Sequence, residues 1–383
     1  MKFGFFMMPL HHPSENPTLA FERDLDFIEY VDHLGFDECF IGEHHSAGWE
    51  TIPAPDIFIA MAAARAKRIT LGTGVINLPY HHPFHVAERM AFLDHLTRGR
   101  LVMGVGPGVL ATDLMLFGLP VDQVRPMSSE ALDIIIRLLE SDGPITYEGK
   151  YWQLKEMEIQ VKSYQQPRLP IAMASSGSMN SLQQAGKYGL PVWSLANSPI
   201  ASSVPLPQQW SVIEEAANKA GRQVSRDDWR LVHYVHVAES KEKAMEDISE
   251  GILQAVSYNF GNGSQGQFLD YPEQPFSEVT AEQVVRNREW IVGDPDEVTR
   301  EIRALFDQAG GAGGLLITIN EWAPVDKMYR NLELFARYVM PALQGTSASI
   351  QRAWEKTQRW NEEGIIAGYR QGMKRSDGAK RAS

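Results

Sequence analysis

Cysteine is almost absent from this chain, since Cys39 is the only one in 383 residues. An internal disulfide is therefore impossible, and the fold must be stabilised by its buried core. We expect Cys39 to be a small buried side chain within a β-strand, which is the usual environment of a structural thiol.

Long apolar runs and an excess of positive charge are also missing. No apolar run approaches the roughly 20 residues that cross a bilayer. The first residues, MKFGFFMMPLHH, resemble a β-strand and lack the pattern of a signal peptide. The net charge of -12 argues against nucleic acid or an anionic membrane as the main partner. We therefore expect a soluble, cytoplasmic protein.

The chain instead alternates short apolar strands with amphipathic helices. Helices are predicted at 55–66 and 84–96, and another is predicted to start at Ser128 or Ser129. The eight predicted strands span residues 2–8, 38–42, 69–78, 101–105, 171–174, 192–195, 230–238 and 315–319. Eight strands, each followed by a helix, predict an α/β fold of the (β/α)8 TIM-barrel type.

Three segments depart from this alternation. Residues 144–162 predict a β-hairpin, because a glycine separates two aromatic-rich runs. Residues 261–294 are rich in Gly, Pro, Ser and Gln, and they predict a long loop that acts as a lid or is disordered. We divide the chain into a barrel, 1–344, and a C-terminal helical extension with a basic tail, 345–383, whose last dozen residues we expect to be disordered.

Pairs of histidines follow the first three strands, at 11–12, 44–45 and 81–82. The carboxyl ends of barrel strands form one rim, and barrel enzymes keep their chemistry there. We predict that these six imidazoles converge on one mouth, and that at least one of His44 and His45 is catalytic, His44 being favoured. The alternative is that they only hold a loop. Adjacent histidines point to opposite sides of an extended chain, so we predict no metal site.

Small residues follow three other strands. Gly104–Gly108 is a poor dinucleotide fingerprint, and a flat turn at Gly106 that approaches a ligand is the better interpretation. Gly72 and Gly74 predict a bulge or a close backbone approach to a ring, with tight helix–strand packing as the alternative. Residues 175–178 suit a phosphate or ordinary helix capping equally well. Asp113 could orient a base, and Arg125 could pair with an anion.

These segments together resemble the bacterial luciferase-like flavin monooxygenases, most of all the limonene 1,2-monooxygenase type, from Met1 to about Gln344. The resemblance rests on MKFGFF at the start, GFDECFIGEHH at 35–45, ITLGTGVINLPYHHP at 69–83, DHLTRGRLVMGVGPG at 94–108, YEGKYWQL, and VGDPDEV at 292–298. Such a family implies a (β/α)8 barrel that binds FMN at its carboxyl-end rim.

The resemblance also implies roles for individual residues. His44 matches the catalytic histidine, with His45 and Asp113 orienting or tuning it. The flavin ring would rest on Gly74 and Val75 beside Gly106. Three residues implied in the substrate pocket are Met8, His11 and Trp193. The implied phosphate site consists of Arg125, Ser175, Ser176, Gly177 and Ser178.

Two positions depart from the family pattern. Gly106 stands where luciferase has its reactive cysteine, and Pro107 replaces an arginine that meets the FMN phosphate. Looser flavin binding follows, which fits a protein that receives reduced FMN from a separate NAD(P)H-dependent flavin reductase.

The resemblance implies a homodimer that uses FMNH2 and O2, through a flavin C4a-hydroperoxide, to insert one oxygen atom into a small apolar substrate. A terpene, a cyclic ketone or an aldehyde would suit. Three alternatives remain open: an F420-dependent hydride-transfer enzyme of the same fold, a non-catalytic luciferase-like subunit, and a metal-dependent barrel hydrolase.

Overall fold

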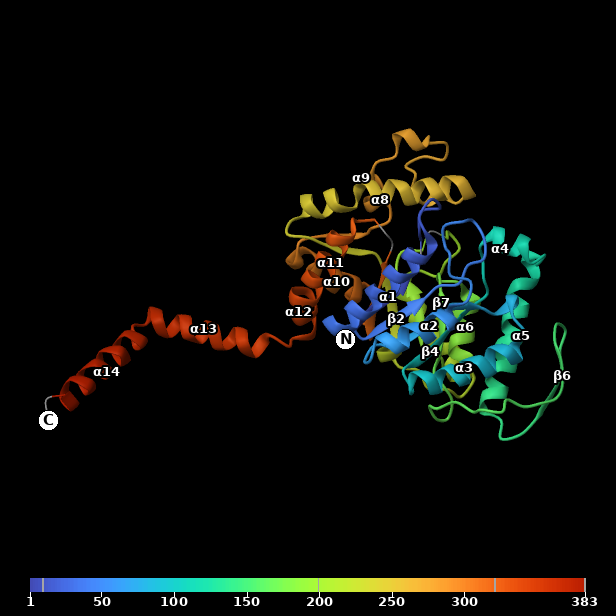
Figure 1. The fold of residues 1–383 in the computed structure, drawn as a ribbon, viewed down its shortest axis with the longest axis horizontal. Coiled ribbons are helices and arrows are strands. Elements are labelled where there is room, and N and C mark those ends of the chain that lie inside the picture. Colours follow the sequence, from blue (N-terminus) through green and yellow to red (C-terminus); the bar gives the residue numbers. More distant parts are fainter. Residues whose placement is uncertain (9, 199, 320–321, 382–383) are drawn as a thin grey trace.

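The computed structural model describes residues 1–8, 10–198, 200–319 and 322–381. Within them, eight strands close a parallel barrel in the order β1-β12-β9-β8-β7-β4-β3-β2 (Figure 1). The barrel strands are β1 (Lys2–Met7), β2 (Glu38–Ile41), β3 (Thr70–Asn77), β4 (Leu101–Gly106), β7 (Ile171–Ser175), β8 (Val192–Leu195), β9 (Trp229–His233) and β12 (Gly314–Ile319). The predicted (β/α)8 fold is confirmed.

Helices surround the barrel (Figure 1). They include α1 (Pro17–Leu34), α2 (Pro55–Arg65), α3 (Pro83–Thr97), α5 (Val121–Glu140), α6 (Met179–Tyr188), α7 (Leu206–Lys219), α10 (Pro295–Ala309) and α11 (Val325–Leu334). The side chain of Asn16 caps α1 by accepting from the backbone N–H groups of the first turn, and Gly35 ends it at a φ of 90°. The helix predicted from Ser128 or Ser129 begins earlier, at Val121.

The floor of the barrel is aromatic. Trp193 on β8 stacks on Phe40 of β2, with ring centroids 4.0 Å apart, and both side chains are buried. Ala172, Val232 and Leu316 pack in the same cluster. These inward-facing side chains fill the barrel interior, so space for a ligand exists only above them, towards the carboxyl ends of the strands. Cys39 is fully buried, as predicted.

The two predicted insertions differ in outcome. Residues 144–162 contain the antiparallel hairpin of β5 (Ile145–Glu148) and β6 (Gln153–Met157), as predicted. Residues 261–294 are more ordered than the predicted loop. The segment contains the end of α8 (Lys241–Asn262), two short 3-10 helices, α9 (Ala281–Asn287) and β11 (Ile291–Gly293).

A small second core explains this order. Side chains of α8 and α9, among them Ile248, Ile252 and Val284, are buried together with Trp290. β11 pairs in parallel with β10 (Val235–Val237), so the strand predicted at 230–238 divides into β9 within the barrel and β10 outside it. Both α8 and α9 lie together at one end of the molecule (Figure 1).

The C-terminal residues leave the barrel. After α12 (Met340–Gln344), α13 (Ala348–Glu362) and α14 (Ile365–Arg381) project away from the body (Figure 1). The end that we expected to be disordered is therefore helical as far as Arg381, and only residues 382–383 lie outside the described part. Among the described residues, no helix has the length and apolar character needed to cross a membrane.

Candidate active site

A cavity of about 470 Å³ opens at the carboxyl ends of the barrel strands. Residues at the ends of β1, β3, β4, β7, β8, β9 and β12 line it, together with the loops that follow. Ten of the residues predicted from the sequence are among them: Met8, His44, Gly74, Val75, Gly106, Arg125, Ser175, Ser176, Ser178 and Trp193. The fold thus brings together residues that are up to 185 positions apart in the chain.

Four predicted residues do not line this cavity. His45 and Asp113 lie directly behind His44, and Gly177 forms a turn between two lining serines. His11 does not belong to the wall where we predicted it. It is buried against α1, with Nε2 2.9 Å from Asp24 Oδ2.

The predicted convergence of six imidazoles is therefore wrong. Of these histidines only His44 lines the cavity, and His12 is exposed. His82 caps α3, because its Nδ1 accepts from the backbone N–H of Phe84. The pairs share a position after a strand, but adjacent residues in an extended segment point in different directions.

His44 is held between two carboxylates. Its Nδ1 lies 3.1 Å from Asp113 Oδ2, and its Nε2 lies 2.9 Å from Glu50 Oε2. Asp113, in the first turn of α4 (Ala111–Leu116), is fully buried and also accepts from the backbone N–H of His45 and the hydroxyl of Ser46. The orientation of the imidazole is therefore fixed from both sides.

These contacts determine the charge of the imidazole. Burial alone would lower the pKa of His44, but the Asp113 and Glu50 carboxylates outweigh it and raise the pKa to about 10. Burial would raise the pKa of Asp113, but its hydrogen bonds with His44 and Ser46 hold that pKa below the usual value. At neutral pH, His44 is consequently an imidazolium in the cavity wall, with its Nδ1 proton facing Asp113 and its Nε2 proton facing Glu50.

Glu43 connects the ends of β2 and β3. Its Oε1 accepts from His45 Nε2 at 2.8 Å and from His81 Nε2 at 2.6 Å, and its Oε2 accepts from the backbone N–H of Asn77. The ligand atoms of Glu43, His45 and His81 are close enough to hold a metal ion. Hydrogen bonding accounts for the same distances, so the cluster gives no reason to abandon the prediction of a metal-free site.

Glu43 and Glu50 are the residues that sequence reasoning missed. Glu43 had a signal, because it directly precedes His44 at the end of a strand. Glu50 had none, since its position depends on how the loop after β2 folds back beside Leu10.

One part of the cavity suits an anion. Ser178 caps α6 by accepting from the backbone N–H of Ser181, and both serines line the cavity with Ser176. Arg125 on α5 also lines it, and no ion pair among the described residues includes this guanidinium. A cation, hydroxyl groups and a helix N-terminus together fit a phosphate. Capping and anion binding, which we posed as alternatives, are thus compatible here.

Another part of the wall comes from the glycines of β3 and β4. The pairing of these strands shifts between Thr73 and Ile76, which confirms the predicted bulge, and the Gly74-Val75 peptide is cis. A Cβ on Gly74 would lie 2.9 Å from Phe40 Cβ on β2, so the close packing at this glycine is between neighbouring strands and not between helix and strand. A Cβ on Gly106 would lie 2.8 Å from Val75 Cγ2, so a side chain there would displace Val75.

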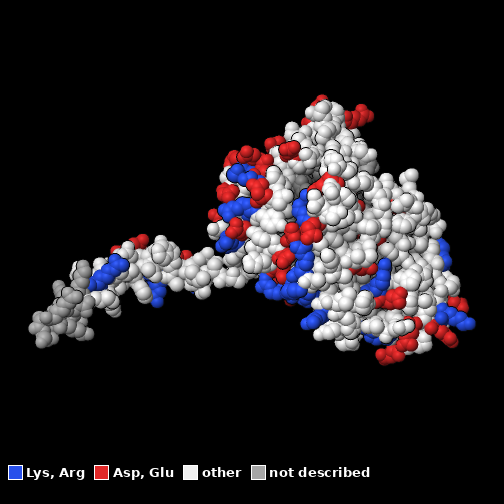
Figure 2. Space-filling view, in the orientation of Figure 1, with Lys and Arg blue, Asp and Glu red and all other residues white. Residues whose placement is uncertain are grey.

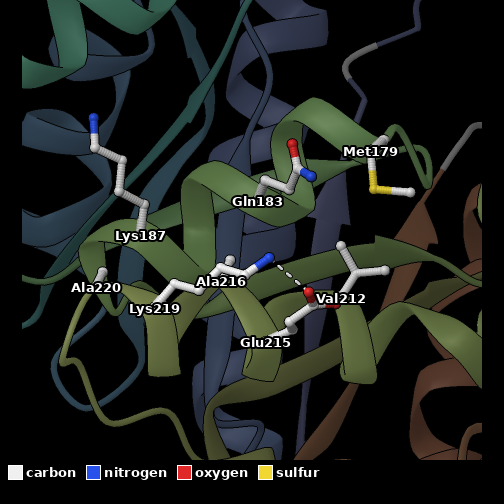
Figure 3. A pocket seen from close by; sticks show the side chains of 8 residues that line it. All are labelled: Met179, Gln183, Lys187, Val212, Glu215, Ala216, Lys219 and Ala220. Atoms are coloured by element: carbon white, nitrogen blue, oxygen red, sulfur yellow. Dashed lines mark hydrogen bonds and ion pairs between the residues drawn. The ribbon is translucent and has the colours of Figure 1, made fainter.

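A second cavity, of about 540 Å³, lies on the outside of the barrel between α6 and α7 (Figure 3). Its lining residues come only from these helices and their ends, and Glu215 and Lys219 form an ion pair along α7. No strand end and no histidine contributes to this groove. Although this groove is larger, it lacks the histidine and the strand-end residues that line the cavity at the barrel mouth.

A parallel barrel whose mouth holds an anion site beside a protonated histidine defines the class of the protein as a TIM-barrel enzyme. The chain belongs to the luciferase-like monooxygenase family, whose model matches residues 1–313. The resemblance inferred from the sequence is therefore confirmed.

The similarity to curated relatives covers nearly the whole chain. 4-Hydroxyprotoasukamycin monooxygenase of Streptomyces nodosus subsp. asukaensis is 39% identical over 92% of this chain and 95% of its own length. Limonene 1,2-monooxygenase of Rhodococcus erythropolis is 35% identical over 94% and 91%. Among solved structures, the oxygenating constituent of 3,6-diketocamphane monooxygenase of Pseudomonas putida, in complex with FMN, has a TM-score of 0.75 at 25% identity, covering 90% of this chain and 98% of that chain.

Proposed function

We propose that the protein is an FMN-dependent monooxygenase that transfers one atom of O2 to a small apolar molecule, such as a terpene, a cyclic ketone or an aldehyde. A separate NAD(P)H-dependent reductase would supply the reduced flavin. The observation that carries the proposal is a single cavity that combines an anion site, an apolar wall and the imidazolium of His44. The monooxygenase names of the relatives support it.

The residues present fit FMN. Arg125, Ser176 and Ser178 would hold the phosphate, and the backbone of Gly74 and Val75 would support the ring. The volume of about 470 Å³ falls in the range of small-molecule and cofactor sites. When bound, reduced FMN supplies the electrons that activate O2.

The chain contributes proton transfer and exclusion of water. His44 would supply a proton from Nε2, the nitrogen that faces Glu50 in the cavity wall, and Asp113 on Nδ1 would hold the ring and its charge. Apolar side chains on the floor, Trp193 and Val232 among them, would keep water away and accept the substrate beside Met8. An apolar product would then leave through the same mouth.

Cofactor F420 is the alternative, because F420-dependent enzymes such as the tetrahydromethanopterin reductase of Methanopyrus kandleri share this fold. Fluorescence titrations with FMN, riboflavin and F420 would distinguish them. We expect binding of FMN, and we expect Arg125→Ala to weaken FMN binding by about 10–100-fold, the value of a charge-assisted hydrogen bond. Riboflavin, which lacks the phosphate, serves as the control and should bind the variant and the wild type equally.

The activity is tested with photoreduced FMN, ¹⁸O2 and a panel of terpenes, cyclic ketones and aldehydes. We expect one ¹⁸O atom in the product, measured by mass spectrometry. Turnover that depends on F420 and leaves O2 unused would overturn the proposal in favour of hydride transfer. Flavin binding without any product would favour the non-catalytic subunit.

A further inference from the structure

Three aromatic side chains from distant parts of the chain pack against one another beside the cavity. Tyr234 follows β9, Trp290 precedes β11, and Trp322 follows β12. The ring centroid of Tyr234 lies 4.5 Å from that of Trp290 and 4.9 Å from that of Trp322, and the two indoles are 4.3 Å apart. Of the three, only Tyr234 lines the cavity at the barrel mouth.

These distances decide which side of the tyrosine is open. A ring lying between two indoles would hold them well apart, yet Trp290 and Trp322 stack on each other. Both indoles therefore lie on the same side of the Tyr234 ring. Tyr234 is half-buried, so the other side of its ring is left to face the cavity that it lines.

The second core holds this aromatic cluster in place. Trp290 is buried within that core, and Trp322 packs against it. Phe268 contacts Trp290 edge-on. On the side of α8, a Cβ on Gly251 would lie 2.2 Å from the backbone oxygen of Trp322, so only glycine allows this close approach. The position of Tyr234 is therefore fixed by residues outside the barrel.

The solvent side of α8 is charged. Glu242, Glu246 and Glu250 are exposed, and Figure 2 shows charged side chains of both signs gathered where α8 begins. The apolar side chains of α8 are buried in the same core as Trp290. None of the described residues of α8 lines the cavity. This helix therefore supports the cavity wall from behind and is not part of the wall.

Tyr234 stands opposite the wall proposed for the flavin ring. In the closed barrel, β9 and β3 are four strand-to-strand steps apart in either direction, so they face each other across the mouth. Gly74 and Val75 belong to β3 and line the same cavity as Tyr234. A substrate bound between these two walls would contact the Tyr234 ring on the side away from β3.

We propose that Tyr234 is a specificity-determining residue, and that it selects a substrate with a flat, unsaturated ring. The proposal rests on the function proposed above and narrows its substrate class. Flat π systems attract one another beyond what the burial of apolar area gives. A puckered saturated ring makes fewer contacts with a flat wall, and an open chain also loses conformational freedom on binding. Trp322 is a positioning residue, because it contacts Tyr234 and does not line the cavity.

Binding of two ligands with the same carbon skeleton tests the proposal. Carvone has a flat enone ring, and carvomenthone is its fully saturated counterpart. Equilibrium dialysis of the full-length protein, with and without oxidised FMN, gives both dissociation constants. The wild type should bind carvone about 5–10-fold more tightly than carvomenthone. Tyr234→Leu keeps an apolar wall without the flat ring, so it should weaken carvone binding by about 5–10-fold and leave carvomenthone binding within about twofold.

Three further variants separate the ring of Tyr234 from other effects. Tyr234→Phe should match the wild type, because it keeps the ring and loses only the hydroxyl. Tyr369→Leu is the matched control and should also match it, since Tyr369 is exposed on α14, which projects away from the barrel (Figure 1). Trp322→Leu leaves the cavity lining unchanged but removes support from Tyr234, so the preference for carvone should fall by about 2–5-fold.

Two results would overturn the proposal: a wild type that binds carvone no more tightly than carvomenthone, or a folded Tyr234→Leu variant that keeps the wild-type preference. Circular dichroism checks the folding of each variant. Where Tyr234→Leu does not fold, Trp322→Leu decides by the same comparison. Dialysis measures binding without turnover, so a protein that binds carvone selectively but incorporates no ¹⁸O would count against the proposed function and not against the role of Tyr234.

Discussion

His44 combines a fixed orientation with a fixed charge, and the two have the same cause. Asp113 and Glu50 contact the two nitrogens of one imidazole, so each nitrogen has a defined carboxylate partner. An unperturbed histidine would be mostly neutral at pH 7. Here the ring stays protonated at neutral pH, with each of its N–H groups facing a carboxylate.

Replacing His44 tests its role directly. We expect His44→Ala to lower product turnover by about 10²–10⁴-fold, the usual contribution of a general acid. FMN binding should persist, because the proposed phosphate site lies on α5 and at the start of α6, away from His44 in the chain. Exposed His85 provides the matched control, and His85→Ala should turn over like the wild type. Unchanged turnover by His44→Ala, measured with photoreduced FMN, would remove this residue from the mechanism.

Glu50 gives a pH-dependent prediction. Glu50→Gln removes one of the two carboxylates that raise the pKa of His44, so that pKa should fall from about 10 towards its usual range. Turnover that needs the protonated ring is lost as pH rises through this pKa. The alkaline limb of the pH–rate profile should therefore move to lower pH in the variant.

A profile of Glu50→Gln that coincides with the wild type, while the protein stays folded, would contradict this account. The raised pKa of His44 also stabilises the folded protein, and this contribution is likewise lost as the pH rises. It is fully present below about pH 6.5, the unfolded value, and is lost as the pH rises towards 10.

At the scale of secondary-structure elements, β3 and β4 meet so closely that only glycine fits at Gly106. A Cβ there would lie 2.8 Å from Val75 Cγ2. We expect Gly106→Ala to lower the free energy of unfolding by about 1–3 kcal/mol, the usual cost of overpacking. Urea denaturation measures it.

A second substitution separates this contact from other effects. Val75→Ala removes the methyl groups that the new Cβ would meet, so Gly106→Ala should cost much less in that background. Equal costs in both backgrounds would show that the contact with Val75 is not the cause.

The elements show where sequence patterns succeed and where they fail. Each predicted barrel strand is present, because short apolar β-branched runs between helices usually form buried strands. The segment 261–294 differs from the predicted loop because the apolar side chains of its short helices are buried in a cluster with distant residues, α8 among them, and periodicity cannot reveal such contacts. Its role as a lid stays a prediction.

The same limit applies to the site. Met8, His44 and Ser176 were predictable because each follows a strand and must therefore reach the rim, whereas Val75, inside β3, was implied only by the family resemblance. His11 also follows a strand, yet it turns to Asp24 of α1, and Glu50 reaches the cavity from a loop. Position after a strand indicates the rim, but the direction of a side chain depends on its loop.

At the scale of the whole molecule, the flavin site should exchange its ligand readily. The cavity is lined by Pro107 where the resemblance places a phosphate-binding arginine, and Arg125 is exposed. In the proposed scheme, a weakly held phosphate would let reduced FMN arrive from another protein. We therefore expect the purified protein to show no turnover with NADH and FMN alone.

Adding a flavin reductase should restore turnover, and an unrelated reductase should serve as well as a cognate one, because free FMNH2 carries the electrons. Photoreduced FMN should bypass the reductase altogether. Product formation measured in parallel under these three conditions checks the prediction. Turnover with NADH and FMN in the absence of any reductase would mean that the chain oxidises the nicotinamide itself, and the two-component scheme would then be wrong.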